Sequence, residues 1–158
     1  ALAAATPVAL RDTLQPWEII HLYTHSPSGR PGNSPYLTLN VTISDPNTLP
    51  ITQTPTGTAI FPPSSVNCSA EWLEHPPIGQ EIECTASDYA KWTMTMTPGT
   101  DENGYGSTQE FGLEFKLVDS VRVLNVPYTR VFTGGDQFKV GVNMQGQCGG
   151  SGTCNWAI

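Results

Sequence analysis

The sequence predicts an all-β fold, an antiparallel β-barrel or β-sandwich of about ten short strands with two local disulfides. Three observations predict it. Apolar and polar residues alternate with a period of two along several segments. Gly and Pro are abundant, 15 and 14 of 158 residues, and they cluster between these segments. No segment reads as a convincing amphipathic helix, because the best candidate, 70–75, is too short.

Four segments show the alternation clearly and are expected to be strands. In 37–44, 92–97, 111–117 and 138–144, apolar residues take one face and mostly polar residues or Gly the other. Weaker strands are expected at 17–24, 66–73, 80–85, 121–125, 128–132 and 153–157. The tryptophans of two predicted strands, Trp72 and Trp92, are expected inside the core.

Turn-forming residues separate the predicted strands. The stretch 46–65 holds five prolines and is expected to be a long surface loop. Gly134-Gly135-Asp136 is expected to form a turn that separates two strands. Since 158 residues favour one domain, we expect a single β domain over 17–158. The Ala-rich start, with its small-x-small triplets, predicts a signal-peptide remnant or a flexible N-terminal segment over 1–16.

The four cysteines fall as two local pairs and support an oxidising, extracellular compartment. Four cysteines allow three connectivities. We prefer Cys68–Cys84 with Cys148–Cys154, because this pairing closes the shortest loops. A zinc site is disfavoured, since no C-x₂₋₄-C pair occurs and the second pair has no His nearby. We therefore expect no metal and no cofactor.

Two triplets match the N-glycosylation sequon, beginning at Asn40 and Asn67. Asn40 lies on the polar face of the predicted strand 37–44, where a glycan can project into solvent. Asn67 directly precedes Cys68, and a disulfide there would hinder modification. Asn40 is therefore the better candidate.

Composition excludes several classes of function. The chain carries 7 Lys+Arg and 14 Asp+Glu, a formal net charge of −7, so it lacks the basic patch of a nucleic-acid binder. The acidity favours basic partners and not anionic membranes. No apolar run reaches the length of a membrane span. Four Trp, five Tyr and five Phe supply enough core material to argue against disorder.

No constellation of residues predicts catalysis. Glu81 and Glu83 share a face of a predicted strand and are the carboxylate pair at a spacing suited to glycoside hydrolysis, but a solvated strand face explains them better. His21 and His25 would lie about 13 Å apart along a strand, too far to share a metal ion. His75 precedes two prolines and is expected in a loop. No G-x-S-x-G nucleophile motif occurs.

The order of motifs between 17 and 156 resembles the Alternaria major-allergen family of small secreted fungal proteins. The resemblance is carried by the strand beginning at Trp17, by Cys-Ser-Ala at 68–70, by a second Cys at 84, by the long apolar strand 111–117 and by the Gly-rich loop between Cys148 and Cys154. It implies a compact β-barrel or sandwich with disulfides Cys68–Cys84 and Cys148–Cys154. The upstream Cys that links a dimer in some members is missing, so a disulfide-linked dimer is not expected.

The resemblance also implies a role without catalysis. It suggests a secreted, allergen-like effector or elicitor, active in plant defence or virulence. Such a protein would act in the plant apoplast by binding a host receptor or a thaumatin-like defence protein. We expect binding through exposed loops at 26–35, 46–65 and 98–107. The alternative is a carbohydrate-binding or carbohydrate-active β-sandwich that uses Glu81 and Glu83. A weaker possibility is the binding of small phenolics inside a barrel.

Overall fold

The computed structural model describes residues 14–85, 87–99 and 106–158, and this part of the chain consists of antiparallel strands and turns without a helix. The predicted all-β class is therefore confirmed. The segment 1–16, expected to be a signal-peptide remnant or a flexible lead-in, falls mostly on residues outside the described part. The strands are β1 (Glu18–Ser26), β2 (Leu37–Asp45), β3 (Leu49–Thr54), β4 (Gly57–Phe61), β5 (Ser64–Trp72), β6 (Glu81–Glu83), β7 (Ala90–Thr97), β8 (Glu110–Val123), β9 (Val126–Lys139), β10 (Gln145–Cys148) and β11 (Cys154–Ala157).

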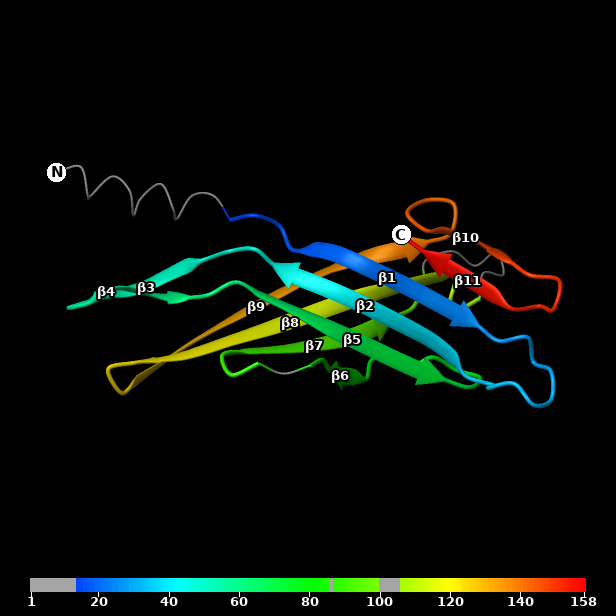
Figure 1. Ribbon diagram of the computed structural model, residues 1–158, viewed down its shortest axis with the longest axis horizontal. Coiled ribbons are helices and arrows are strands. Elements are labelled where there is room, and N and C mark those ends of the chain that lie inside the picture. The colour runs from blue at the N-terminus through cyan, green and yellow to red at the C-terminus, as the bar shows by residue number, and fades with distance from the viewer. Residues whose placement is uncertain (1–13, 86, 100–105) are drawn as a thin grey trace.

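Two sheets stack face to face as a sandwich, and they do not close into a barrel. The first sheet has the strand order β10–β11–β1–β2–β5, and the second has the order β6–β7–β8–β9. Figure 1 shows the strands of one sheet crossing those of the other. A separate two-stranded sheet, β3–β4, extends beyond the sandwich at one end.

The core lies between the inner faces of the two sheets, as the period-two patterns predict. Alternate residues of β5 are buried along its whole length, and the same alternation holds over most of β2. Trp72 and Trp92 are both buried, as expected. The Trp92 indole nitrogen donates to Ser64 Oγ at 3.0 Å, so the ring is buried without an unmet hydrogen bond. Besides Trp92, both sheets contribute large, fully buried side chains: Leu22, Leu39, Val41, Ile43, Met94, Met96, Phe111, Leu113 and Leu117.

Both predicted local disulfides are present, and they join different parts of the fold. Cys68 of β5 bonds Cys84, which directly follows β6, so this bridge joins an edge of one sheet to an edge of the other. The Thr85 amide also donates to the Asn67 carbonyl at 3.1 Å beside it. Cys148–Cys154 closes the β10–β11 hairpin within a single sheet.

The expectation of a long surface loop at 46–65 is wrong, because β3 and β4 form a hairpin there. The prolines lie where a strand tolerates a missing N–H donor. Pro50 stands at a register shift between the two strands, Pro55 is in the turn, and Pro62 and Pro63 separate β4 from β5. In the sequence these prolines look like those of a loop, although they lie at the register shift, in the turn and after the end of the hairpin.

The strands β8 and β9 are longer than expected, at 14 residues each. The glycines at 134–135 do not interrupt β9, contrary to expectation. A Cβ on Gly134 would lie 3.3 Å from the Trp17 ring, and one on Gly135 would lie 2.6 Å from the Leu113 carbonyl oxygen. These glycines mark places where other groups approach a continuous strand closely.

Two other predicted strands are also wrong. The segment 121–125 is the end of β8 and the following turn, not a strand of its own. The segment 138–144 leaves β9 at Lys139 and turns back, with Gly141 at a φ of 87°. Asn143 Oδ1 accepts the Lys139 amide at 2.9 Å, which stabilises this turn in place of a strand.

Candidate functional site

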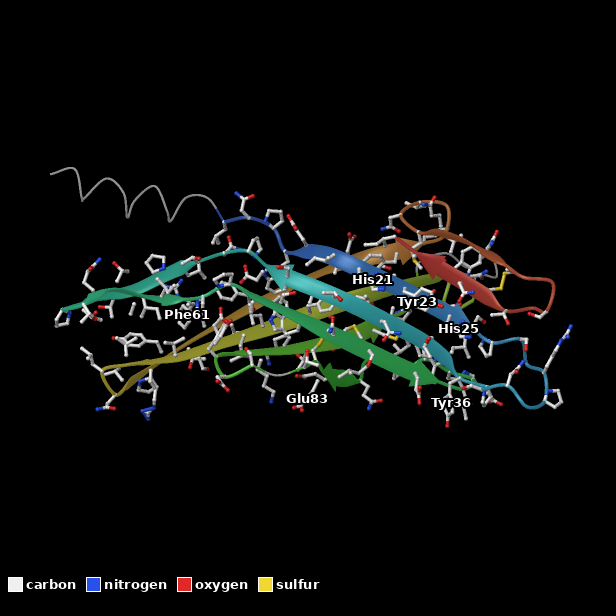
Figure 2. The ribbon with its side chains drawn as sticks, viewed as in Figure 1. His21, Tyr23, His25, Tyr36, Phe61 and Glu83 are labelled. Atoms are coloured by element: carbon white, nitrogen blue, oxygen red, sulfur yellow. A yellow bond between two sulfur atoms is a disulfide. The ribbon has the colours of Figure 1, made fainter. Side chains whose placement is uncertain are left out.

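At one end of the molecule, the β3–β4 hairpin and the far part of the β8–β9 hairpin project beyond the sandwich (Figure 1). We call residues 49–61 and 119–131 the hairpin end. A groove of about 500 Å³ runs between the two hairpins, lined by residues of the β3–β4 turn, β4 and the end of β8. Elsewhere in the hairpin end the Arg130 guanidinium of β9 lies over the Phe61 ring of β4, 5.9 Å from the ring centroid, and so joins the two hairpins. Figure 2 marks Phe61 at this position.

The tip of the β8–β9 hairpin is a two-residue turn at Leu124 and Asn125. Their φ angles are 50° and 67°, and Val123 pairs with Val126 across the turn. Such turns favour Asn and Gly, because left-handed backbone costs other residues about 1–2 kcal/mol. Leu124 nevertheless occupies this position and is 74% exposed. Its side chain contributes nothing to the core.

Apolar and positively charged side chains are exposed along the hairpin end. Val126 is 50% and Val131 55% exposed, and Ile60 is exposed on the facing hairpin. The hairpin end carries Arg122 and Arg130, and its one carboxyl group, Asp119, is buried. This end is therefore locally cationic in a chain whose net charge is −7.

A second surface feature is a hollow of about 780 Å³ on the outer face of the β6–β9 sheet. We call it the outer trough. Its floor is a grid of three cross-strand rows over β7, β8 and β9. The rows are Thr93–Lys116–Thr133, Thr95–Glu114–Gly135 and Thr97–Gly112–Gln137. Glu81 of β6 pairs with Thr95 and extends the middle row.

Glu81 and Glu83, which the sequence suggested as a catalytic pair, share the outer face of β6, opposite Thr95 and Thr93. Glu83 makes an ion pair with Lys91, at 3.1 Å between Nζ and Oε1, and is not part of the outer trough. Glu81 lines the trough, where its nearest carboxylate along the same row is Glu114, two strands away. Two strand spacings separate their Cα atoms by about 9.5 Å. Glu114 and Glu81 were not paired in the sequence analysis, because the two residues are far apart in the sequence and meet only through strand pairing.

The three histidines have separate surroundings. His25 Nδ1 lies 2.8 Å from Asn155 Oδ1, which also accepts the Tyr23 hydroxyl at 2.6 Å. The His21 ring stacks on Tyr23, and Figure 2 shows these side chains following one another along β1. His75 is exposed in the segment after β5. Within the residues that the structure describes, no three His, Cys, Asp or Glu side chains gather as a metal site.

The two predicted glycosylation sites differ in their surroundings. Asn40 is exposed on the outer face of β2, as the strand pattern predicted. Asn67 is exposed on β5, but its side-chain Oδ1 accepts a hydrogen bond from the Thr42 hydroxyl at 2.6 Å. Its backbone N–H donates to Thr85 Oγ1. Asn40 therefore remains the better candidate on steric grounds.

Two buried carboxyl groups lie near the junction of the sandwich with the hairpin end. Asp119 is 1% exposed, and one of its oxygens has no hydrogen-bond partner among the described residues. Burial raises the pKa of the Asp119 carboxyl from 3.8 to about 6, and the charge of the nearby Asp45 adds to the rise. Asp45 is also buried and accepts two hydrogen bonds from Asn47.

A smaller apolar cleft of about 400 Å³ opens between the start of β1 and β9. Trp17 forms one wall and packs edge-on against Trp92, with ring centroids 4.7 Å apart. Phe132 and Phe138 line the opposite wall. The cleft lies between the sheets at their edge. It is not the interior of a closed barrel, which is where the sequence analysis would have small phenolics bind.

The three loops expected to bind fare differently. The loop between β1 and β2 is exposed over 29–36, in agreement with an accessible loop at 26–35. The segment 46–65 contributes to the hairpin end through β3 and β4. Most of 98–107 lies outside the described residues.

Comparison with protein-family models, with curated proteins and with solved structures finds no match to this chain. No helix in the described ranges is long and apolar enough to cross a membrane. Function therefore has to be inferred from the hairpin end, the outer trough and the disulfides.

Proposed function

We propose that this protein is a secreted, non-catalytic effector or elicitor, which acts by binding a host plant protein through its hairpin end. The observation that carries the proposal is Leu124, an exposed apolar side chain in a turn that disfavours it. A residue that costs stability and makes no core contact is explained when a partner buries it.

The chemistry of the hairpin end describes the partner. Arg122 and Arg130 favour an acidic surface, and Leu124 and Val126 favour an apolar hollow within that surface. The net charge alone suggested basic partners, and the local charge of this end reverses that preference. Among host proteins, an acidic member of the thaumatin-like defence proteins is the class that the sequence resemblance favours.

Two disulfides support secretion, because such bonds persist mainly in oxidising compartments. They also brace the scaffold that holds the hairpins. The absence of catalysis is part of the proposal, and the surroundings of the candidate groups support it. Glu83 is engaged by Lys91, and His25 is engaged by Asn155.

Leu124→Asn is the variant that tests this proposal. Asn suits the left-handed turn, so the free energy of unfolding in urea should rise by about 1 kcal/mol. The same change should abolish retention of the partner from plant apoplastic fluid and the oxidative burst of treated leaf discs. Arg122→Glu should also abolish both, without the gain in stability.

Matched variants on other surfaces serve as controls. Val142→Asn changes an exposed valine in the connection between β9 and β10, and Arg30→Glu reverses a charge in the β1–β2 loop. Both should bind as the unchanged protein does. If Arg30→Glu abolishes the response and Leu124→Asn does not, the β1–β2 loop is the binding surface and the proposal fails.

A further inference from the structure

The floor of the outer trough carries threonines and two glycines beside its charged side chains. Thr97 Oγ1 and Gln137 Nε2 both lie over Gly112, in the space that a side chain there would fill. In the next row the Glu114 side chain lies beside Gly135, where a Cβ would be 3.3 Å from Glu114 Cγ. From Thr93 to Thr97 the trough runs about 13 Å along β7. The hollow is thus long enough for two or three sugar rings in a row.

Thr93 shows that the floor of the trough is prepared for a polar ligand. It is only 6% exposed, yet its hydroxyl makes no hydrogen bond to any described residue. Nearly buried polar groups normally have a partner, in the protein or in a bound molecule. The carboxylates of Glu81 and Glu114 likewise make no hydrogen bond or ion pair within the described ranges.

The side chains around the trough favour a hydroxyl-rich ligand with positive charge. Four threonine hydroxyls and the Gln137 amide can donate and accept hydrogen bonds. Leu113 and Phe115 also border the hollow, but their side chains are buried in the core. Among the lining residues that the register places on the outer face, the two carboxylates of Glu81 and Glu114 outnumber the one ammonium of Lys116. An apolar or anionic ligand therefore does not fit.

An extended peptide fits less well than a glycan. Peptides that bind sheets usually pair with the free backbone groups of an edge strand. The trough lies on a sheet face, and β7 and β8 are each paired on both sides. Recognition must then come from side-chain hydroxyls and carboxylates, which match the hydroxyl and amino groups of a sugar chain.

We infer that the outer trough binds an oligosaccharide with free amino groups, of the β-linked glucosamine type. Sugar hydroxyls would bond the threonines on the floor. Protonated sugar amines would lie against Glu81 and Glu114, whose separation by two strand spacings suits amines on neighbouring rings. This site is separate from the hairpin end and does not depend on the function proposed for it.

Calorimetric titration with three hexamers, of glucosamine, of N-acetylglucosamine and of glucose, tests the inference. The buffer is held below the pKa of the sugar amine. We expect only the glucosamine hexamer to bind with a dissociation constant below about 1 mM, since the trough has no exposed aromatic ring to strengthen binding. Glu114→Gln and Thr93→Val should each weaken it about tenfold.

Glu71→Gln is the matched control, because it removes one negative charge from an exposed position of β5, in the other sheet. It should leave the affinity unchanged, and urea unfolding should show that each variant is folded. Three results overturn the inference: equal affinity for all three hexamers, equal loss in Glu71→Gln and Glu114→Gln, or tighter binding of a lysine-rich peptide.

Discussion

Leu124 and Asp119 both stand in positions that oppose their intrinsic preferences. Leu124 is a bulky side chain in left-handed backbone, and Asp119 is a carboxyl group without full hydrogen bonding in the protein interior. Both lie in the β8–β9 hairpin. The first strain is relieved in the proposed complex. The second depends on pH, because protonation removes the buried charge.

Asp119 should make the protein more stable in mild acid than at neutral pH. Its pKa is near 6 in the folded protein and 3.8 when unperturbed, so the folded state holds more protons between these values. Stability should therefore fall as the pH rises from about 4 to about 6, by up to about 3 kcal/mol in total.

Asp119→Asn checks this expectation, because an amide of the same shape carries no charge. Urea unfolding at pH 4.5 and pH 7 should show a decline for the unchanged protein and a much smaller one for the variant. An identical pH dependence in both proteins would assign the decline to other groups. Asp45→Asn should give a smaller change, since Asp45 is the lesser cause of the shift.

Among the elements, the two disulfides differ in what they hold together. Cys68–Cys84 joins the two sheets over a separation of 16 residues, and Cys148–Cys154 spans only 6 within one hairpin. Replacing both cysteines of the first pair by Ala should lower the free energy of unfolding by about 3 kcal/mol, and of the second pair by about 2. Thermal unfolding of the two double variants measures the difference. The prediction is wrong if the second pair proves the more important.

The strands that the sequence predicted correctly are those of the core. In β2, β5 and β7 apolar side chains face the core and mostly polar side chains face outward, and this leaves an alternating pattern in the sequence. β3 and β4 escaped prediction because they lie outside the sandwich, where burial does not impose alternation. In β9 the glycines signal a turn locally, but Trp17 and Leu113 approach them from elsewhere in the chain.

The candidate sites were less predictable than the fold. Exposed strand faces leave a free choice of polar residues, so Glu81 and Glu83 look equivalent until cross-strand pairing is known. The trough depends on β7, β8 and β9 meeting in one register. Leu124 was read as part of a strand, because its unusual backbone appears only in the folded hairpin.

At the scale of the whole molecule, the two proposed surfaces occupy different places. The hairpin end projects from one end of the sandwich (Figure 1). The outer trough lies on the outer face of the β6–β9 sheet. Residues that share no partners usually act independently. Leu124→Asn should therefore leave glucosamine-hexamer binding unchanged, and Glu114→Gln should leave the leaf response unchanged. Reciprocal loss in either assay would show that the two surfaces form one site.

The pairing of β1 with β11 has a consequence for how the protein is made. His25 of β1 pairs with Asn155 of β11, so one neighbour of β1 in the sheet is a strand 130 residues further along the chain. Chains leave the ribosome from the N-terminus, and β1 must wait for that strand while synthesis proceeds. Cys84 emerges much earlier, so the first disulfide can form before the sandwich does. Such long-range pairing makes folding slow, and during that time the edge of β1 is open to other chains.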